Sequence, residues 1–101
     1  MLFTTIEADI NGTSLQGEIV TTRAEIEAVF GQPTYSTQDE WEKVTTEWDI
    51  TFSDGTVATI YDWKRYEMGA PKMYESYGWH IGGRTHYAVS LVTQAMKEDK
   101  D

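Results

Sequence analysis

Residues 44–52 constrain the fold of this chain more than any other segment, because their side chains alternate strictly in character. One set is mostly apolar and the other polar: Val44, Thr46, Trp48, Ile50 and Phe52 against Thr45, Glu47, Asp49 and Thr51. A period of two is typical of a β-strand with one buried face. Asp54-Gly55 then marks a turn, and residues 56–63 are rich in β-formers. The pattern predicts a long antiparallel hairpin.

The turn leaves the register of this hairpin open. A two-residue turn would place Val57, Thr59, Tyr61 and Trp63 opposite the apolar set. A three-residue turn with a glycine bulge would place Ala58 and Ile60 there instead. Both registers stay in the prediction, because a slip of one residue exchanges the two faces of the strand.

The N-terminal part predicts a second hairpin and a short helix. Two β-rich stretches, 3–10 and 14–21, flank the turn pair Asn11-Gly12, and Gly17 indicates a bulge or a close backbone approach. Residues 22–33 then carry helix signals. They comprise a capping box, an apolar stripe and a stop: Thr22 with Glu25, then Ile26, Val29 and Phe30, then Gly31 and Pro33.

The C-terminal part predicts a strand, a helix and exposed connections. Residues 77–81 form the strand, which Gly82-Gly83 ends, and residues 35–40 and 66–76 are loops. Residues 85–97 predict a helix with the apolar stripe Ala88, Leu91, Val92, Ala95 and Met96. The predicted fold is α+β, an antiparallel sheet with two helices packed on one face, in the order β-β-α-β-β-β-α. A single domain spans residues 1–97, and 98–101 are a solvated tail.

The composition excludes several classes of function but does not assign one. The chain has 101 residues, no cysteine and a net charge of −9. The absence of cysteine excludes disulfides, thiolate metal sites and a cysteine nucleophile. The acidity argues against direct contact with nucleic acid or anionic membranes. No signal peptide and no membrane span are visible, so we expect a cytoplasmic protein.

No pattern of catalytic residues emerges. The two histidines, His80 and His86, lack carboxylates at a recognisable metal-ligand spacing, and no serine sits in a G-x-S-x-G elbow. We therefore predict no metal site, no cofactor and no enzymatic activity. The function expected is binding.

Two groups of residues are candidates for a protein-binding surface. The acidic group lies before and along the predicted central strand: Asp39, Glu40, Glu42, Glu47 and Asp49. Alternate carboxylates on one strand face stand roughly 6.5–7 Å apart and could imitate the charge of a nucleic-acid backbone, or simply form a solvated face. The second group lies in the 66–76 loop, where side chains typical of interface centres gather: Tyr66, Met68, Met73 and Tyr74.

Two alternatives remain beside a protein-binding inhibitor or modulator. Gly82, Gly83 and Arg84 precede a predicted helix, where free amides and a cation could hold a small nucleotide-like ligand. The chain could also be a structural protein that forms homo-oligomers through an exposed strand edge.

Parts of the chain resemble small hypothetical proteins of bacteriophages. The matching segments are turn and core residues: Phe52-Ser53-Asp54-Gly55-Thr56-Val57-Ala58-Thr59-Ile60-Tyr61-Asp62-Trp63-Lys64, Trp79-His80-Ile81-Gly82-Gly83 and Val29-Phe30-Gly31-Gln32-Pro33-Thr34. The resemblance implies a phage origin. By analogy with other small acidic phage proteins, it implies a host partner that handles nucleic acid, such as a CRISPR effector or a restriction system.

Overall fold

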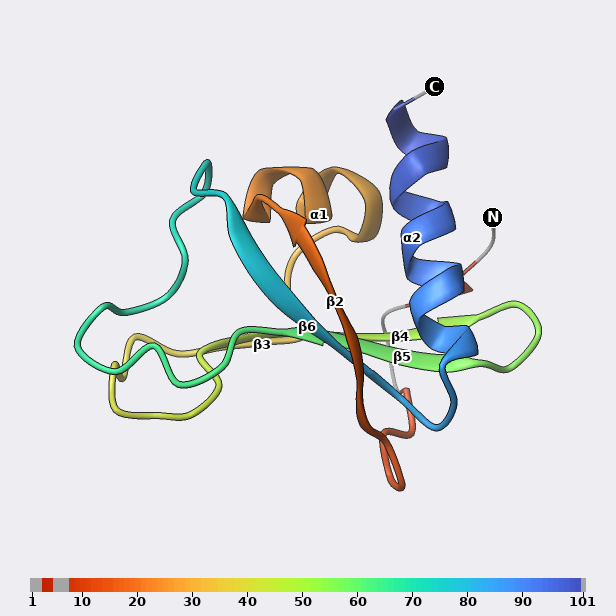
Figure 1. The fold of residues 1–101 in the computed structure, drawn as a ribbon, viewed down its shortest axis with the longest axis horizontal. Helices are drawn as coiled ribbons and strands as arrows, with labels where there is room; N and C mark the ends of the chain where they lie inside the picture. The colour runs from red at the N-terminus through yellow and green to blue at the C-terminus, as the bar shows by residue number, and fades with distance from the viewer. Residues whose placement is uncertain (1–2, 5–7, 101) are drawn as a thin grey trace.

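The computed structural model describes residues 3–4 and 8–100, with the side chains of 99 and 100 left out. Its strands form one antiparallel sheet: β1 (Phe3–Thr4), β2 (Ser14–Thr21), β3 (Tyr35–Ser36), β4 (Thr46–Phe52), β5 (Val57–Tyr61) and β6 (Tyr77–Gly83). Two helices, α1 (Arg23–Phe30) and α2 (Tyr87–Lys100), lie on the same side of this sheet (Figure 1). The fold is α+β and its element order is the predicted one, with the short β3 added.

The strands lie in the order β1-β4-β5-β6-β2, and β3 also pairs with β4. The helix-facing side of the sheet carries the core. Trp48 of β4 and Trp79 of β6 are both fully buried, and their rings meet edge to face at 5.3 Å. Ile26 and Phe30 of α1 close the core from the helix side, together with the α2 stripe. Every residue of that predicted stripe is buried: Ala88, Leu91, Val92, Ala95 and Met96.

The structure resolves the register of the central hairpin. Trp48 lies opposite Ile60, and Ile50 lies opposite Ala58. The turn therefore has three residues, and Gly55 adopts a φ of 89° that favours glycine. The glycine-bulge alternative is correct because it brings the apolar faces of both strands to the same side.

Helix α1 has the predicted caps. At the start of the helix, the Thr22 hydroxyl oxygen accepts a hydrogen bond from the Glu25 amide at 3.1 Å. At its end, the Gly31 amide donates to the Glu27 carbonyl, and the Gly31 backbone has a φ of 81°. The Gly31 carbonyl accepts a further bond from the Trp48 indole at 2.9 Å. This bond ties the end of α1 to the centre of β4.

The predicted N-terminal hairpin is wrong. β1 pairs with β4 and β2 pairs with β6, so the two strands lie at opposite edges of the sheet. Gly12 does form a local turn, in which the Thr13 amide donates to the Ile10 carbonyl. A turn signal fixes only local geometry, and the better apolar partners of β2 are Trp79 and Ile81 on β6. Residues 5–7 of the predicted first strand lie outside the described residues.

Several boundaries also differ from the prediction. Helix α2 begins at Tyr87 and continues to Lys100, whereas the sequence placed its start at 85 and its end at 97, followed by a solvated tail. β4 begins at Thr46 rather than residue 44, and part of the predicted 35–40 loop is the strand β3. β6 continues through Gly82 and Gly83, which the sequence placed in a turn. A Cβ at Gly82 would collide with the Thr59 hydroxyl, and one at Gly83 would collide with the Ala88 Cβ. The absence of a side chain at these two glycines therefore allows the close packing. The bulge predicted at Gly17 is present, between Leu15 and Gly17.

Candidate protein-binding site

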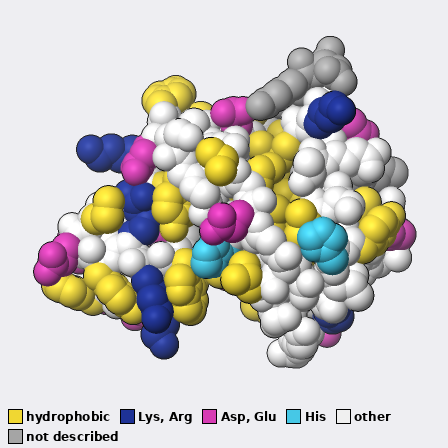
Figure 2. Space-filling view, viewed as in Figure 1, with side chains coloured by type: hydrophobic (Ala, Val, Ile, Leu, Met, Phe, Trp, Pro, Cys, Tyr) yellow, Lys and Arg dark blue, Asp and Glu magenta, His cyan; other side chains and the backbone are white. Residues whose placement is uncertain are grey.

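Two loops, residues 37–45 and 62–76, meet at one end of the molecule, which we call the loop end (Figure 1). Large apolar side chains are exposed here: Trp41, Trp63, Tyr66, Met68, Met73 and Tyr74. Trp41 of the first loop stacks on Tyr66 of the second, with ring centroids 6.2 Å apart. Figure 2 shows hydrophobic side chains at this end of the molecule interspersed with both basic and acidic ones. The loop end thus combines aromatic anchors with a mixed charged rim, as protein interfaces do.

A buried carboxylate joins the bases of the two loops. Asp62 is fully buried and accepts three hydrogen bonds, from the Thr45 amide at 2.7 Å, the Thr45 hydroxyl at 2.5 Å and the Thr46 amide at 2.9 Å. A backbone bond from the Lys64 amide to the Lys43 carbonyl, 2.7 Å long, continues the connection outward. Because a buried charge is stable only when it is fully hydrogen-bonded, Asp62 holds both loop bases in one geometry.

The 62–76 loop is organised around Arg65. Its buried guanidinium donates to both carboxylate oxygens of Glu75 at 3.1 and 3.2 Å and to the Gly69 carbonyl at 3.0 Å, and it lies 4.8 Å from the Tyr77 ring. A hydrogen bond from the Lys72 amide, together with Arg65, lowers the pKa of Glu75. The Met73 carbonyl accepts from the amide of Ala24 on α1. The loop is therefore ordered despite its exposed tip.

Backbone strain is also concentrated in this loop. Lys64 and Glu67 have φ values of 51° and 66°, and among the described residues they are the non-glycine residues with positive φ. Such conformations persist only where surrounding contacts enforce them, and they gather at functional sites. The strain therefore marks the segment that presents Trp63 and Tyr66.

The predicted acidic group divides into two parts. Asp39, Glu40 and Glu42 are exposed in the first loop, beside Trp41. Glu47 and Asp49 lie on β4, on the sheet face opposite the helices, and are partly buried. The structure therefore brings the first three acids together with the aromatic anchors and leaves the other two under the sheet.

Burial changes the charge of the β4 pair. Partial burial, followed by the hydrogen bond and negative charge of neighbouring Asp49 and by the charge of Asp62, together raise the pKa of Glu47 to about 8. Glu47 is consequently protonated at neutral pH, and the pair carries less than two negative charges. A line of fully charged carboxylates along β4, as the sequence suggested, is not what this geometry favours.

The three residues predicted to bind a small ligand make contacts within the protein itself. Gly82 and Gly83 pair with β2 on one side and with β5 on the other. The Arg84 guanidinium donates to the carbonyls of Asp9 and Asn11 at 2.7 and 3.1 Å. Arg84 also borders a shallow pocket of about 280 Å³, lined by Asp54, Gly55, Thr56, Val57 and Thr85. The two glycines stand in ladder pairing rather than in a free turn, so the phosphate-binding arrangement expected from sequence does not form.

Other aromatic residues at and near the loop end lie outside the two predicted groups. Trp63 stacks on His80 with centroids 6.2 Å apart, and the His80 ring also meets Tyr61 at 5.4 Å. Trp41 stands in a polar loop, and a tryptophan flanked by charged residues is itself a sequence signal of exposure. The pairing of Trp41 with Tyr66 has no signal in the sequence, because it depends on how the two loops meet.

A scan against protein-family models finds no match for this chain, and a search of curated proteins finds none either. No helix among the described residues is long and apolar enough to cross a membrane. Within the same part of the chain, no three metal-binding side chains are grouped together.

Proposed function

We propose that this chain is a non-catalytic inhibitor or modulator that binds another protein through its loop end. The observation that carries the proposal is the stacked, exposed pair Trp41 and Tyr66. Energetic centres of protein interfaces are enriched in tryptophan and tyrosine. An exposed pair of large rings is otherwise unfavourable on a small monomer.

The order of the loop end supports binding through a preformed surface. Asp62 and Arg65 fix the two loops from below, so the exposed rings lose little conformational freedom when a partner covers them. A surface that is ordered before contact binds more tightly than a flexible one of the same composition. Here the exposed acids beside Trp41 would face the partner together with the rings.

The partner we propose is a host protein that handles nucleic acid, as the phage resemblance implies. Such proteins present basic surfaces, which suit a chain with a net charge of −9. In this proposal the aromatic anchors supply most of the affinity, and the loop acids contribute orientation and rate. Because the raised pKa of Glu47 reduces the negative charge on β4, this strand is a weaker candidate for imitation of nucleic acid.

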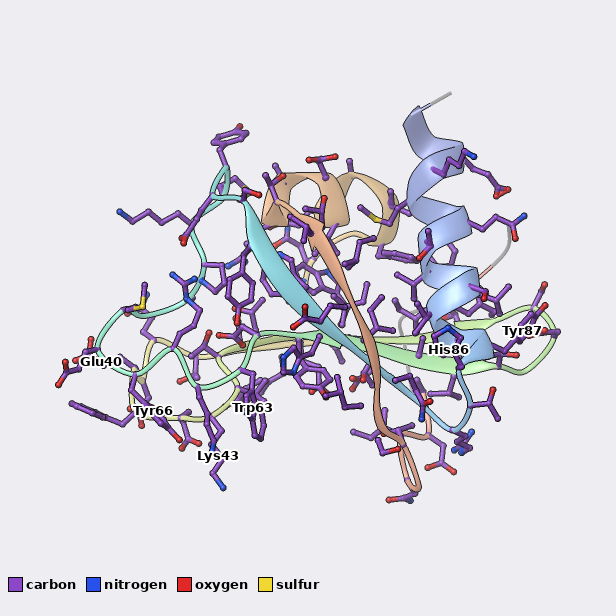
Figure 3. The ribbon with its side chains drawn as sticks, in the orientation of Figure 1. Glu40, Lys43, Trp63, Tyr66, His86 and Tyr87 are labelled. Carbon is purple, nitrogen blue, oxygen red and sulfur yellow. The ribbon has the colours of Figure 1, made fainter. Side chains whose placement is uncertain are left out.

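The test compares three forms of the tagged chain in capture from nuclease-treated bacterial lysate. They are the wild type, the double variant Trp41→Ala/Tyr66→Ala, and the control Tyr87→Ala. Tyr87 is 52% exposed and lies at the other end of the molecule (Figure 3). We expect one protein to be retained by the wild type and the control and lost by the double variant. Equal retention by all three forms, or by none, would contradict the proposal.

A further inference from the structure

We infer that the open face of Trp41 is a docking platform for an arginine side chain on a basic partner protein. The inference rests on the proposed function and deepens it by naming the chemistry that the loop end recognises. It follows from the geometry of one ring and from the charges placed around that ring.

Trp41 is supported on one side and open on the other. Its ring is stacked on Tyr66 with an interplanar angle of 24°, yet 61% of the residue remains exposed. An indole held flat against a second ring offers a planar surface of fixed orientation. A guanidinium group is also planar and stacks on such surfaces, whereas a lysine ammonium is a compact point charge.

Two other aromatic rings are already paired with cations of the chain itself. The Lys64 ammonium lies 5.5 Å from the centre of the Trp63 ring, and the Arg65 guanidinium lies over Tyr77. Among the described residues, Trp41 has no such cation over its ring. The chain therefore leaves one exposed tryptophan face for a cation from outside.

Three exposed carboxylates neighbour Trp41 in the chain. Trp41 follows Asp39 and Glu40 directly in the sequence and precedes Glu42, and all three acids are exposed. Glu40 lies at the tip of the loop end, close to Tyr66 in the view of Figure 3. An arginine over the indole could thus bond a carboxylate while its plane rests on the ring. Charge and shape select the same kind of side chain.

The loop that carries Trp41 is ordered before any partner arrives. The Asp39 carboxylate accepts a hydrogen bond from the Trp41 amide at 3.0 Å, and the Asp39 carbonyl accepts from the Glu42 amide at 3.2 Å. The Thr37 hydroxyl oxygen accepts from the Asp39 amide at 3.2 Å. These bonds order the backbone that carries the ring and the flanking acids, so a partner need not organise that backbone.

The experiment titrates the nitrogen-15-labelled chain of 101 residues with an arginine octapeptide and, separately, with a lysine octapeptide. Tryptophan indole N–H signals are assigned by single replacements with phenylalanine. We expect the Trp41 signal to shift with the arginine peptide. We also expect the arginine peptide to bind about 3- to 5-fold more tightly than the lysine peptide at equal salt.

Variants separate stacking from simple charge attraction. Trp41→Ala should abolish the preference for arginine, and Glu40→Gln/Glu42→Gln should weaken both peptides. Glu18→Gln/Glu98→Gln, which removes the same charge elsewhere, should leave the preference intact. Equal affinity for both peptides in the wild type, or an unmoved Trp41 signal, overturns the inference.

The outcomes also separate this inference from the proposed function. If the arginine preference is absent but capture from lysate still depends on Trp41 and Tyr66, the loop end binds a different chemistry and the inference fails alone. If the preference is present but capture ignores both rings, the platform stands and the proposed function fails.

Discussion

Replacement of Glu47 by glutamine should change how the stability of this protein depends on pH. In the folded chain the pKa of Glu47 is about 8, whereas the ordinary value is 4.5. Between these values the folded state holds a proton that the unfolded state has released. The free energy of unfolding therefore falls as pH rises through this window, and becomes level above about pH 8. Glu47→Gln stays neutral and removes this loss.

The size of the effect follows from the pKa difference and the exposure of the side chain. Each pH unit between the two pKa values contributes at most about 1.4 kcal/mol. Glu47 is only partly buried, so solvent screens its charge, and we expect a total of about 2 kcal/mol. Glu47→Gln should match the wild type near pH 5 and exceed it by about this amount at pH 9, which is about 1–2 M in the urea midpoint.

Urea unfolding followed by tryptophan fluorescence between pH 5 and 9 measures this difference. Groups that are the same in both proteins contribute equally to the two curves, so subtraction isolates the contribution of residue 47. The control is Glu42→Gln, which removes the same charge from an exposed loop position and so measures the part of the difference that comes from net charge alone. A constant difference between wild type and Glu47→Gln across this range would refute the reasoning.

Three further predictions concern the fold and its edge. Asp62→Asn should lower the free energy of unfolding by about 2–4 kcal/mol in chemical denaturation, since an amide cannot accept all three bonds from Thr45 and Thr46. An unchanged denaturation midpoint would show that the carboxylate does not join the two loops. Gly83→Ala should cost about 1–3 kcal/mol in thermal unfolding, because its Cβ would collide with Ala88, and a silent substitution would contradict that packing. The edge strand β2 carries a bulge and Glu18, which oppose pairing with a second copy, so light scattering should show a monomer at all concentrations; a concentration-dependent dimer that Val20→Lys abolishes would favour the self-assembly alternative.

The sequence predicts those parts of the fold whose signals are local. The alternation before the central turn and the caps of α1 each depend on neighbours a few residues apart, and both are confirmed. The register of the central hairpin needed one additional fact, the number of residues in its turn. The partner of β2 lay beyond local reasoning, because Asn11-Gly12 specifies a turn but not the strand that follows it onto the sheet.

The candidate site is predictable in its composition but not in its assembly. Exposure of Tyr66, Met68, Met73 and Tyr74 follows from an apolar-rich loop, and the structure places all four at the surface. Glu47 differs from Glu42 because it is partly buried on β4, whereas Glu42 is exposed in a loop. The alternating pattern of the strand does not show how far its polar face is buried. Asp62 ends a β-rich run, and nothing near it in the sequence shows that its three donors come from residues 45 and 46.

Under the proposed function, the same contacts couple the stability of the domain to binding at the loop end. Burial of the Asp62 carboxylate costs desolvation free energy, and an apolar residue would stabilise the core at least as well. The three bonds of Asp62 instead connect the start of β4 with the chain that leaves β5, where the two loops diverge. A polar joint specifies one geometry, whereas an apolar contact there would tolerate several. The stacking of Trp41 on Tyr66 depends on that single geometry. Loss of the Asp62 hydrogen bonds should therefore lower the affinity of the loop end for its partner under conditions in which the domain is still folded.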